Sequence, residues 1–162
     1  MIQANQEMLQ ILFDAALPEK LVMPVHLEKI LAEGLIEEDG CWFLAACRKG
    51  TEGSIKQFGD RTGLESYVNG VHIDVITDRV ELPVLRQQGL LYVQALRKLL
   101  QPKGVFGIVM GISQVVDMDD FSCTVRFYKV RSDEPSYAKD LDGFRDGAVL
   151  IFTTQNLEQV GQ

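Results

Sequence analysis

The sequence has few of the residues on which metal and acid–base chemistry most often depend. Histidine occurs twice, and the three cysteines, Cys41, Cys47 and Cys123, form no C-x-x-C pair. An odd number of unpaired thiols fits a reducing compartment better than a disulfide framework. We therefore expect a cytoplasmic protein with no bound metal or other cofactor.

Familiar catalytic and nucleotide-binding motifs are also missing. The sequence contains no G-x-G-x-x-G, Walker loop, G-x-S-x-G elbow or H-E-x-x-H. The run Asp117-x-Asp119-Asp120 has the acid density of a calcium loop, but Ser122 and Tyr128 stand where an EF-hand needs glycine and glutamate. The sequence therefore favours a binding protein over an enzyme.

Long hydrophobic runs are absent. No uninterrupted apolar run approaches the roughly 18 to 20 residues of a bilayer-spanning helix, and the N-terminus lacks the basic leader and cleavage site of a secretory signal. The 46% apolar composition is ample for one core in a chain of 162 residues. We expect one soluble domain, residues 1–162, with no membrane contact and with a flexible polar tail at 154–162.

Charge is unevenly distributed along the chain. Residues 1–40 hold eight acids against two bases, residues 41–116 nine bases against six acids, and residues 117–162 nine acids against five bases. An acidic surface repels a phosphate backbone, so we expect no direct binding of nucleic acid. The net charge of −7 favours solubility and would also speed the encounter with a basic protein.

Apolar residues recur at helical spacing in three segments. Asn5 can cap a helix over 5–16. Pro24 suits the first position of a helix over 24–33, which Gly34 can end. The longest stripe predicts a helix over 83–101 that anchors the core.

Four apolar runs predict strands: 42–47, buried on both faces, then 105–112, 121–131 and 148–153. Residues 48–63 are rich in glycine and charge and indicate a loop. Residues 63–69 can form a short helix before a strand at Val71, or Asn69-Gly70 can turn a hairpin; we favour the helix.

The segment order predicts an α+β fold, with an antiparallel sheet of about five strands and helices packed on one face. Strands 105–112 and 121–131 should pair, and alternation along the second places three side chains inward, Cys123, Val125 and Phe127, and three outward, Thr124, Arg126 and Tyr128.

Few residues suggest a catalytic site. His72 and Asp74 are two apart on a predicted strand and share a face, so they could form a general base or a two-ligand metal site, although a surface pair is the simpler interpretation. An enzyme would place a small-molecule pocket there, with an anionic substrate drawn to Arg79 or Arg86. We interpret the cysteines as packing residues.

The C-terminal third carries the segments 123–131 (CTVRFYKVR), 140–144 (DLDGF) and 148–152 (AVLIF). This pattern resembles small bacterial immunity proteins, including those of contact-dependent growth inhibition systems. The resemblance implies a cytoplasmic protein that binds the toxin domain of a partner and blocks its active site without performing chemistry.

Our leading hypothesis is a non-enzymatic binding protein that neutralises a basic toxin, of which a nuclease is one candidate. The acidic surface that would meet the partner comprises Glu37, Glu38, Asp39, Asp117, Asp119 and Asp120. A structural or regulatory subunit is a further alternative, and a large apolar surface patch would mark it.

Overall fold

The computed structural model describes residues 2–13, 22–74, 81–114, 120–135, 141 and 147–154. The helices are α1 (Gln6–Phe13), α2 (Val25–Ala32), α3 (Ala45–Lys49), α4 (Ile55–Phe58), α5 (Arg61–Val68) and α6 (Leu82–Leu100), which continues into a 3₁₀ turn at Gln101–Lys103. The strands are β1 (Ile2–Ala4), β2 (Leu35–Glu38), β3 (Cys41–Leu44), β4 (Val71–His72), β5 (Phe106–Gln114), β6 (Phe121–Lys129) and β7 (Ala148–Thr153).

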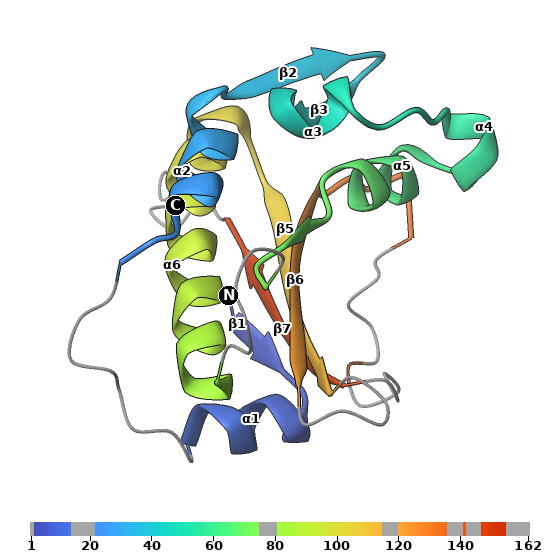
Figure 1. Ribbon diagram of the computed structural model, residues 1–162. Helices are drawn as coiled ribbons and strands as arrows, with labels where there is room; N and C mark the ends of the chain where they lie inside the picture. The colour runs from blue at the N-terminus through green and yellow to red at the C-terminus, as the bar shows by residue number, and fades with distance from the viewer. Residues whose placement is uncertain are drawn as a thin grey trace.

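Five strands form one antiparallel sheet in the order β1-β7-β5-β6-β4 (Figure 1). β5 and β6 pair over nine residues, from Phe106 opposite Lys129 to Gln114 opposite Phe121, and β7 pairs with the other side of β5. The predicted α+β class and the predicted antiparallel pair are confirmed. β1 was not predicted, because three residues are too short to show alternation.

The core lies between the sheet and α6, with α1 and α2 on the same side (Figure 1). Cys123, Val125 and Phe127 face this core, as the alternation predicted. Gly89 of α6 allows close approach, since a Cβ there would lie 2.8 Å from Met110 Sδ and 3.1 Å from Cys123 Sγ. This long helix therefore sits directly on the two central strands.

The predicted helix starts are confirmed where capping residues mark them. The Asn5 side-chain oxygen accepts a hydrogen bond from the Met8 amide at 3.0 Å, which is the expected cap of α1. The same oxygen accepts from the Val149 amide at 3.0 Å, and the Asn5 Nδ2 donates to the Gly147 carbonyl. Asn5 thus fixes α1 to the sheet as well as starting it.

A separate two-stranded hairpin, β2–β3, lies beyond one end of the main sheet (Figure 1). The predicted buried strand over 42–47 is wrong in two respects: the strand ends at Leu44, and residues 45–47 begin α3. Its Trp42 is only half-buried, and the strand pairs with β2 alone. The hairpin nevertheless packs on the sheet through the edge of Trp42 against Phe106, with ring centroids 6.3 Å apart.

Residues 48–63 are not the predicted loop, because they include the end of α3, all of α4 and the start of α5. Ser54 and Gln57 form a capping box for α4, and the Asp60 side chain accepts from the Gly63 amide at the start of α5. The preferred helix over 63–69 is confirmed, with a strand at Val71 after it. α5 contacts β6 from the side opposite α6 (Figure 1).

Candidate functional site

Three of the predicted partner-binding acids gather at the turn of the β2–β3 hairpin, which we call the acidic tip: Glu37, Glu38 and Asp39. All three are exposed. Asp39 and Gly40 form a two-residue turn with φ values of 51° and 76°, the backbone that closes tight hairpins. A cavity of about 280 Å³ lies beside this turn.

The three carboxylates of the acidic tip differ in how far they are neutralised. Glu38 pairs with Arg48 of α3 at 2.9 Å. Glu37 and Asp39 make no hydrogen bond or ion pair with any residue that the structure describes. These two carboxylates are therefore available to an incoming cation.

Of the other predicted acids, the structure places only Asp120, and it lies away from the acidic tip. Asp117 and Asp119 lie outside the described residues, and Asp120 is half-buried at the start of β6. The hairpin packs against Phe106 and thus meets the opposite end of the β5–β6 pair. Nine paired residues separate the two ends by about 27 Å. Asp120 therefore lies at the opposite end of the β5–β6 pair from the acidic tip.

A buried ion pair holds the hairpin against α5 and β6. The Glu65 side chain of α5 is 0% exposed and pairs with Arg131, 7% exposed, at 2.7 Å. The Glu65 carboxylate also accepts from the backbone amides of Trp42 at 2.7 Å and Lys129 at 2.8 Å. Arg131 in turn donates to the Gly40 carbonyl at 2.8 Å. We call Glu65 and Arg131 the buried clamp.

Asn69, at the end of α5, adds a second attachment. Its side-chain oxygen accepts from the Leu44 amide at 2.9 Å, and its Nδ2 donates to the Trp42 carbonyl at 2.9 Å. Asn69 is 1% exposed. Three backbone groups of β3, the amide and carbonyl of Trp42 and the amide of Leu44, are thus satisfied by the side chains of Glu65 and Asn69.

Beside the buried clamp, Glu134 binds the start of α5. Glu134 accepts hydrogen bonds from the Thr62 hydroxyl and amide and from Arg61 Nε. Burial alone would raise the pKa of this carboxyl, but these hydrogen bonds and the nearby charge of Arg131 lower it to about 2. Arg61 also pairs with Asp133, whose side chain is 68% exposed and adds a carboxylate to this end of the molecule.

The pKa of Glu134 predicts an acid-sensitive contribution to stability. A depressed pKa stabilises the fold above the unfolded value near 4.3 and loses this contribution as pH falls toward 2. We expect Glu134→Gln to lower the free energy of unfolding by about 2–3 kcal/mol at pH 7 and by much less at pH 2.5. Urea unfolding at both pH values measures this difference. An equal loss at both pH values would contradict it, and the exposed Glu52→Gln serves as control.

His72 and Asp74 are the alternative catalytic or metal-binding pair, and the structure gives the Asp74 carboxylate another partner. Asp74 accepts from the Cys123 amide at 3.0 Å and from the Ser122 hydroxyl at 3.4 Å, which extends the pairing of β4 with β6. His72 is exposed, and its Nδ1 lies 3.4 Å from the Thr124 hydroxyl. The carboxylate is thus committed to backbone pairing.

The cysteines are poorly suited to nucleophilic chemistry. Burial raises the pKa of Cys41 and Cys47 to about 11 and that of Cys123 to about 12, with smaller contributions from nearby carboxylates. Because the thiolate is the reactive form, these thiols stay protonated at neutral pH. Cys41 and Cys123 lie in the core, as their interpretation as packing residues predicted.

Neither a metal cluster nor a membrane span is found in the part of the chain that the structure describes. No three histidine, cysteine or acidic residues gather there in a metal-binding group. Among the helices described, none has the length and apolar character to cross a bilayer.

Comparison with known proteins decides the family. The model of the uncharacterized protein PM0498 family matches residues 3–160, which is nearly the whole chain. The chain belongs to this family. No curated protein and no solved structure matches the chain.

Proposed function

We propose that this member of the PM0498 family is a non-enzymatic cytoplasmic protein that binds a basic protein partner through its acidic tip. The observation that carries the proposal is the pair of free carboxylates, Glu37 and Asp39, at the turn of a hairpin that the buried clamp holds in place. A partner of the toxin class fits best, and the protein would act as its inhibitor.

The buried clamp supports this proposal because it prepares the hairpin for binding. Glu65 and Arg131 bond to Trp42 and Gly40, so the strand and the turn are both fixed before any partner arrives. A backbone that is already fixed loses less conformational entropy when it binds, and this loss is one of the main costs of association. A mobile acidic loop would bind the same cations more weakly.

Charge at this end of the molecule supports a basic partner. Glu37, Glu38, Asp39 and Asp133 expose their carboxylates here. The nearby guanidinium of Arg131 is buried and paired. Complementary charges raise association rates and exclude partners of the wrong sign.

The inhibitor assignment draws on the resemblance of the C-terminal third to small bacterial immunity proteins. Nucleases are one fitting class of toxin, because their substrate grooves carry the basic residues that neutralise phosphates. Exposed carboxylates can occupy such a groove in place of nucleic acid. Against an enzyme stand the protonated thiols and the commitment of Asp74 to backbone pairing.

Capture and co-expression test the proposal. The tagged protein is isolated from its own cells at low salt, and any stoichiometric companion is identified by mass spectrometry. We expect a basic companion that stops growth when expressed alone and is tolerated together with this protein. The variant Glu37→Lys/Asp39→Lys should restore growth much less well, because it reverses both free charges of the acidic tip.

The matched control is Glu7→Lys/Glu28→Lys, which makes the same change in net charge at exposed positions of α1 and α2. This control should protect like the wild type. Equal protection by both double variants would reject the acidic tip as the contact. A companion that is harmless alone would reject the inhibitor assignment.

A further inference from the structure

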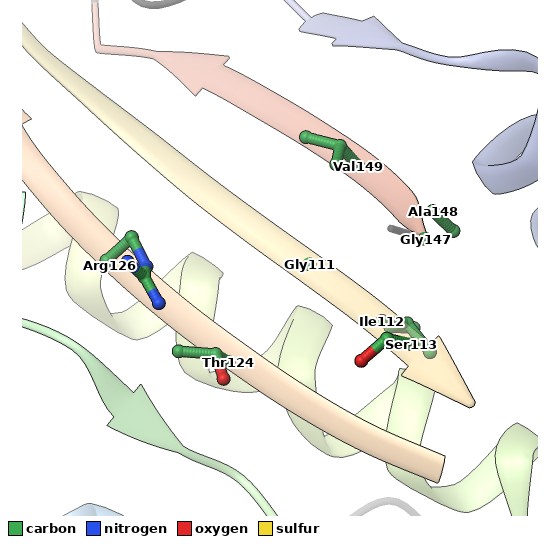
Figure 2. Close-up of a pocket in the computed structure, with 8 residues that line it drawn as sticks. All are labelled: Gly111, Ile112, Ser113, Thr124, Arg126, Gly147, Ala148 and Val149. Atoms are coloured by element: carbon green, nitrogen blue, oxygen red, sulfur yellow. The ribbon is translucent and has the colours of Figure 1, made fainter. Parts of the chain in front are cut away.

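A groove runs along the face of the main sheet that α6 does not cover. It consists of two adjoining cavities of about 500 Å³ and 190 Å³, which share Gly111, Thr124, Arg126 and Val149. Figure 2 shows the smaller cavity, with Gly111 on β5 between Val149 of β7 and the side chains of β6. Tyr67 of α5 lines the larger cavity.

Two glycines on the groove side of β5 create this shape. A Cβ at Gly107 would lie 2.6 Å from Cζ of Tyr128, so glycine there lets the tyrosine ring lie across the strand. At Gly111 a Cβ would meet nothing within 4 Å, so the floor of the groove is open. Tyr67 is 54% exposed and stacks on Phe58 with centroids 4.6 Å apart, which holds it as one wall.

Arg126 supplies a free cation beside this open floor. Its side chain is exposed, lines both cavities, and makes no hydrogen bond or ion pair with any described residue. Among the described residues that line either cavity, it is the sole charged one. A guanidinium pairs in two-pronged fashion with carboxylate or phosphate. The smaller cavity is also lined by two hydroxyl residues, Ser113 of β5 and Thr124 of β6 (Figure 2).

We propose that this groove binds a small molecule that carries a carboxylate or phosphate on a flat apolar body. The anion pairs with Arg126, and the body lies over Gly111 between Val109, Val149 and the Tyr67 ring. The larger cavity has the size of pockets that bury small ligands, about 300–1,000 Å³. The floor at Gly111 admits a flat group without displacing any side chain.

This site is separate from the acidic tip, and neither His72 nor Asp74 is among the described residues that line it. Arg86, which we expected to attract an anionic substrate, is 2% exposed and donates to the Ile11 carbonyl on the α6 side of the sheet. That expectation is therefore wrong for Arg86, and Arg79 lies outside the described residues. His72 borders the groove through Thr124.

Titrations followed by amide NMR test the site with three probes: benzoate, phenyl phosphate and the neutral benzyl alcohol. We expect benzoate or phenyl phosphate to bind with a Kd of roughly millimolar and to change the amide chemical shifts of Gly111 and Thr124. The stronger of the two anions identifies the preferred group. Benzyl alcohol should bind at least about tenfold more weakly, because it leaves Arg126 unpaired.

The variant Arg126→Gln should weaken anion binding about tenfold or more, whereas the control Arg97→Gln, at an exposed position of α6, should leave it unchanged. Gly111→Leu should block the groove to all three probes. Equal affinity in the two arginine variants would overturn the proposal. It would also be overturned if no probe moved the groove amides and the captured protein partner moved them instead.

Discussion

Replacing Glu65 with alanine is expected to lower the free energy of unfolding by about 3–5 kcal/mol. The substitution removes the acceptor of two backbone amides and leaves the guanidinium of Arg131 buried beside a void. Arg131 keeps a longer ion pair with Glu134 at 3.7 Å, but a buried charge that loses its principal partner still costs far more than the loss of an exposed pair. Urea unfolding at neutral pH measures the effect, and Glu52→Ala at an exposed position is the control.

Hydrogen exchange on the same variant separates a local from a global effect. The Trp42 amide loses its acceptor in Glu65→Ala, so it should exchange faster than the amides at the centre of β5. A loss of stability below about 1 kcal/mol would show that the pair is not the attachment we describe.

Gly147→Ala is expected to destabilise the protein by about 2–4 kcal/mol. Gly147 has a φ of 144°, a conformation that other residues rarely adopt, and a Cβ there would lie 2.5 Å from the Ile112 carbonyl oxygen. The strain falls where Asn5 joins the start of β7 to α1. The free energy of unfolding from urea titration checks this value.

A second glycine of the same sheet gives the matched control. Gly111 lies opposite Val149 in the β5–β7 pair, and its missing Cβ would meet nothing within 4 Å. Gly111→Ala should therefore change stability by less than about 1 kcal/mol, with a small gain possible from the less flexible unfolded chain. Equal losses at the two positions would contradict the geometry.

The elements that the sequence predicted correctly are those whose structure depends on residues close together in the chain. The cap at Asn5, the long apolar stripe of α6 and the alternation along β6 each act within a few residues. α3 and α4 escaped prediction because helices of five and four residues are too short for apolar periodicity. β2 escaped because half of its residues are exposed acids.

The site was predictable only in its exposed half. The sequence indicates Glu37 and Asp39 as surface acids, and both are exposed, but the hairpin that carries them was not predicted. Glu65 carries no such signal, because a glutamate in a polar helix normally faces water. Its burial depends on Arg131, 66 residues away, and only the fold brings the two together.

The separation of the acidic tip from Asp120 was also not predictable, because it too depends on how segments distant in the sequence pack together. The acidic tip and Asp120 each lie next to a strand, and the sequence alone does not tell at which end of the sheet each one lies. In the structure, the order of the strands and the packing of Trp42 on Phe106 place the acidic tip at the end of the sheet opposite Asp120. Only the acids of the hairpin therefore enter the proposed contact.

The most direct test of recognition through the acidic tip is the rate of association with the purified companion at low and physiological salt. We predict that the wild-type rate falls by about tenfold between the two and that Glu37→Lys/Asp39→Lys removes most of this dependence. The Glu7→Lys/Glu28→Lys control should keep it. A wild-type rate that does not change with salt, or a tip variant that behaves as the control does, would contradict the account.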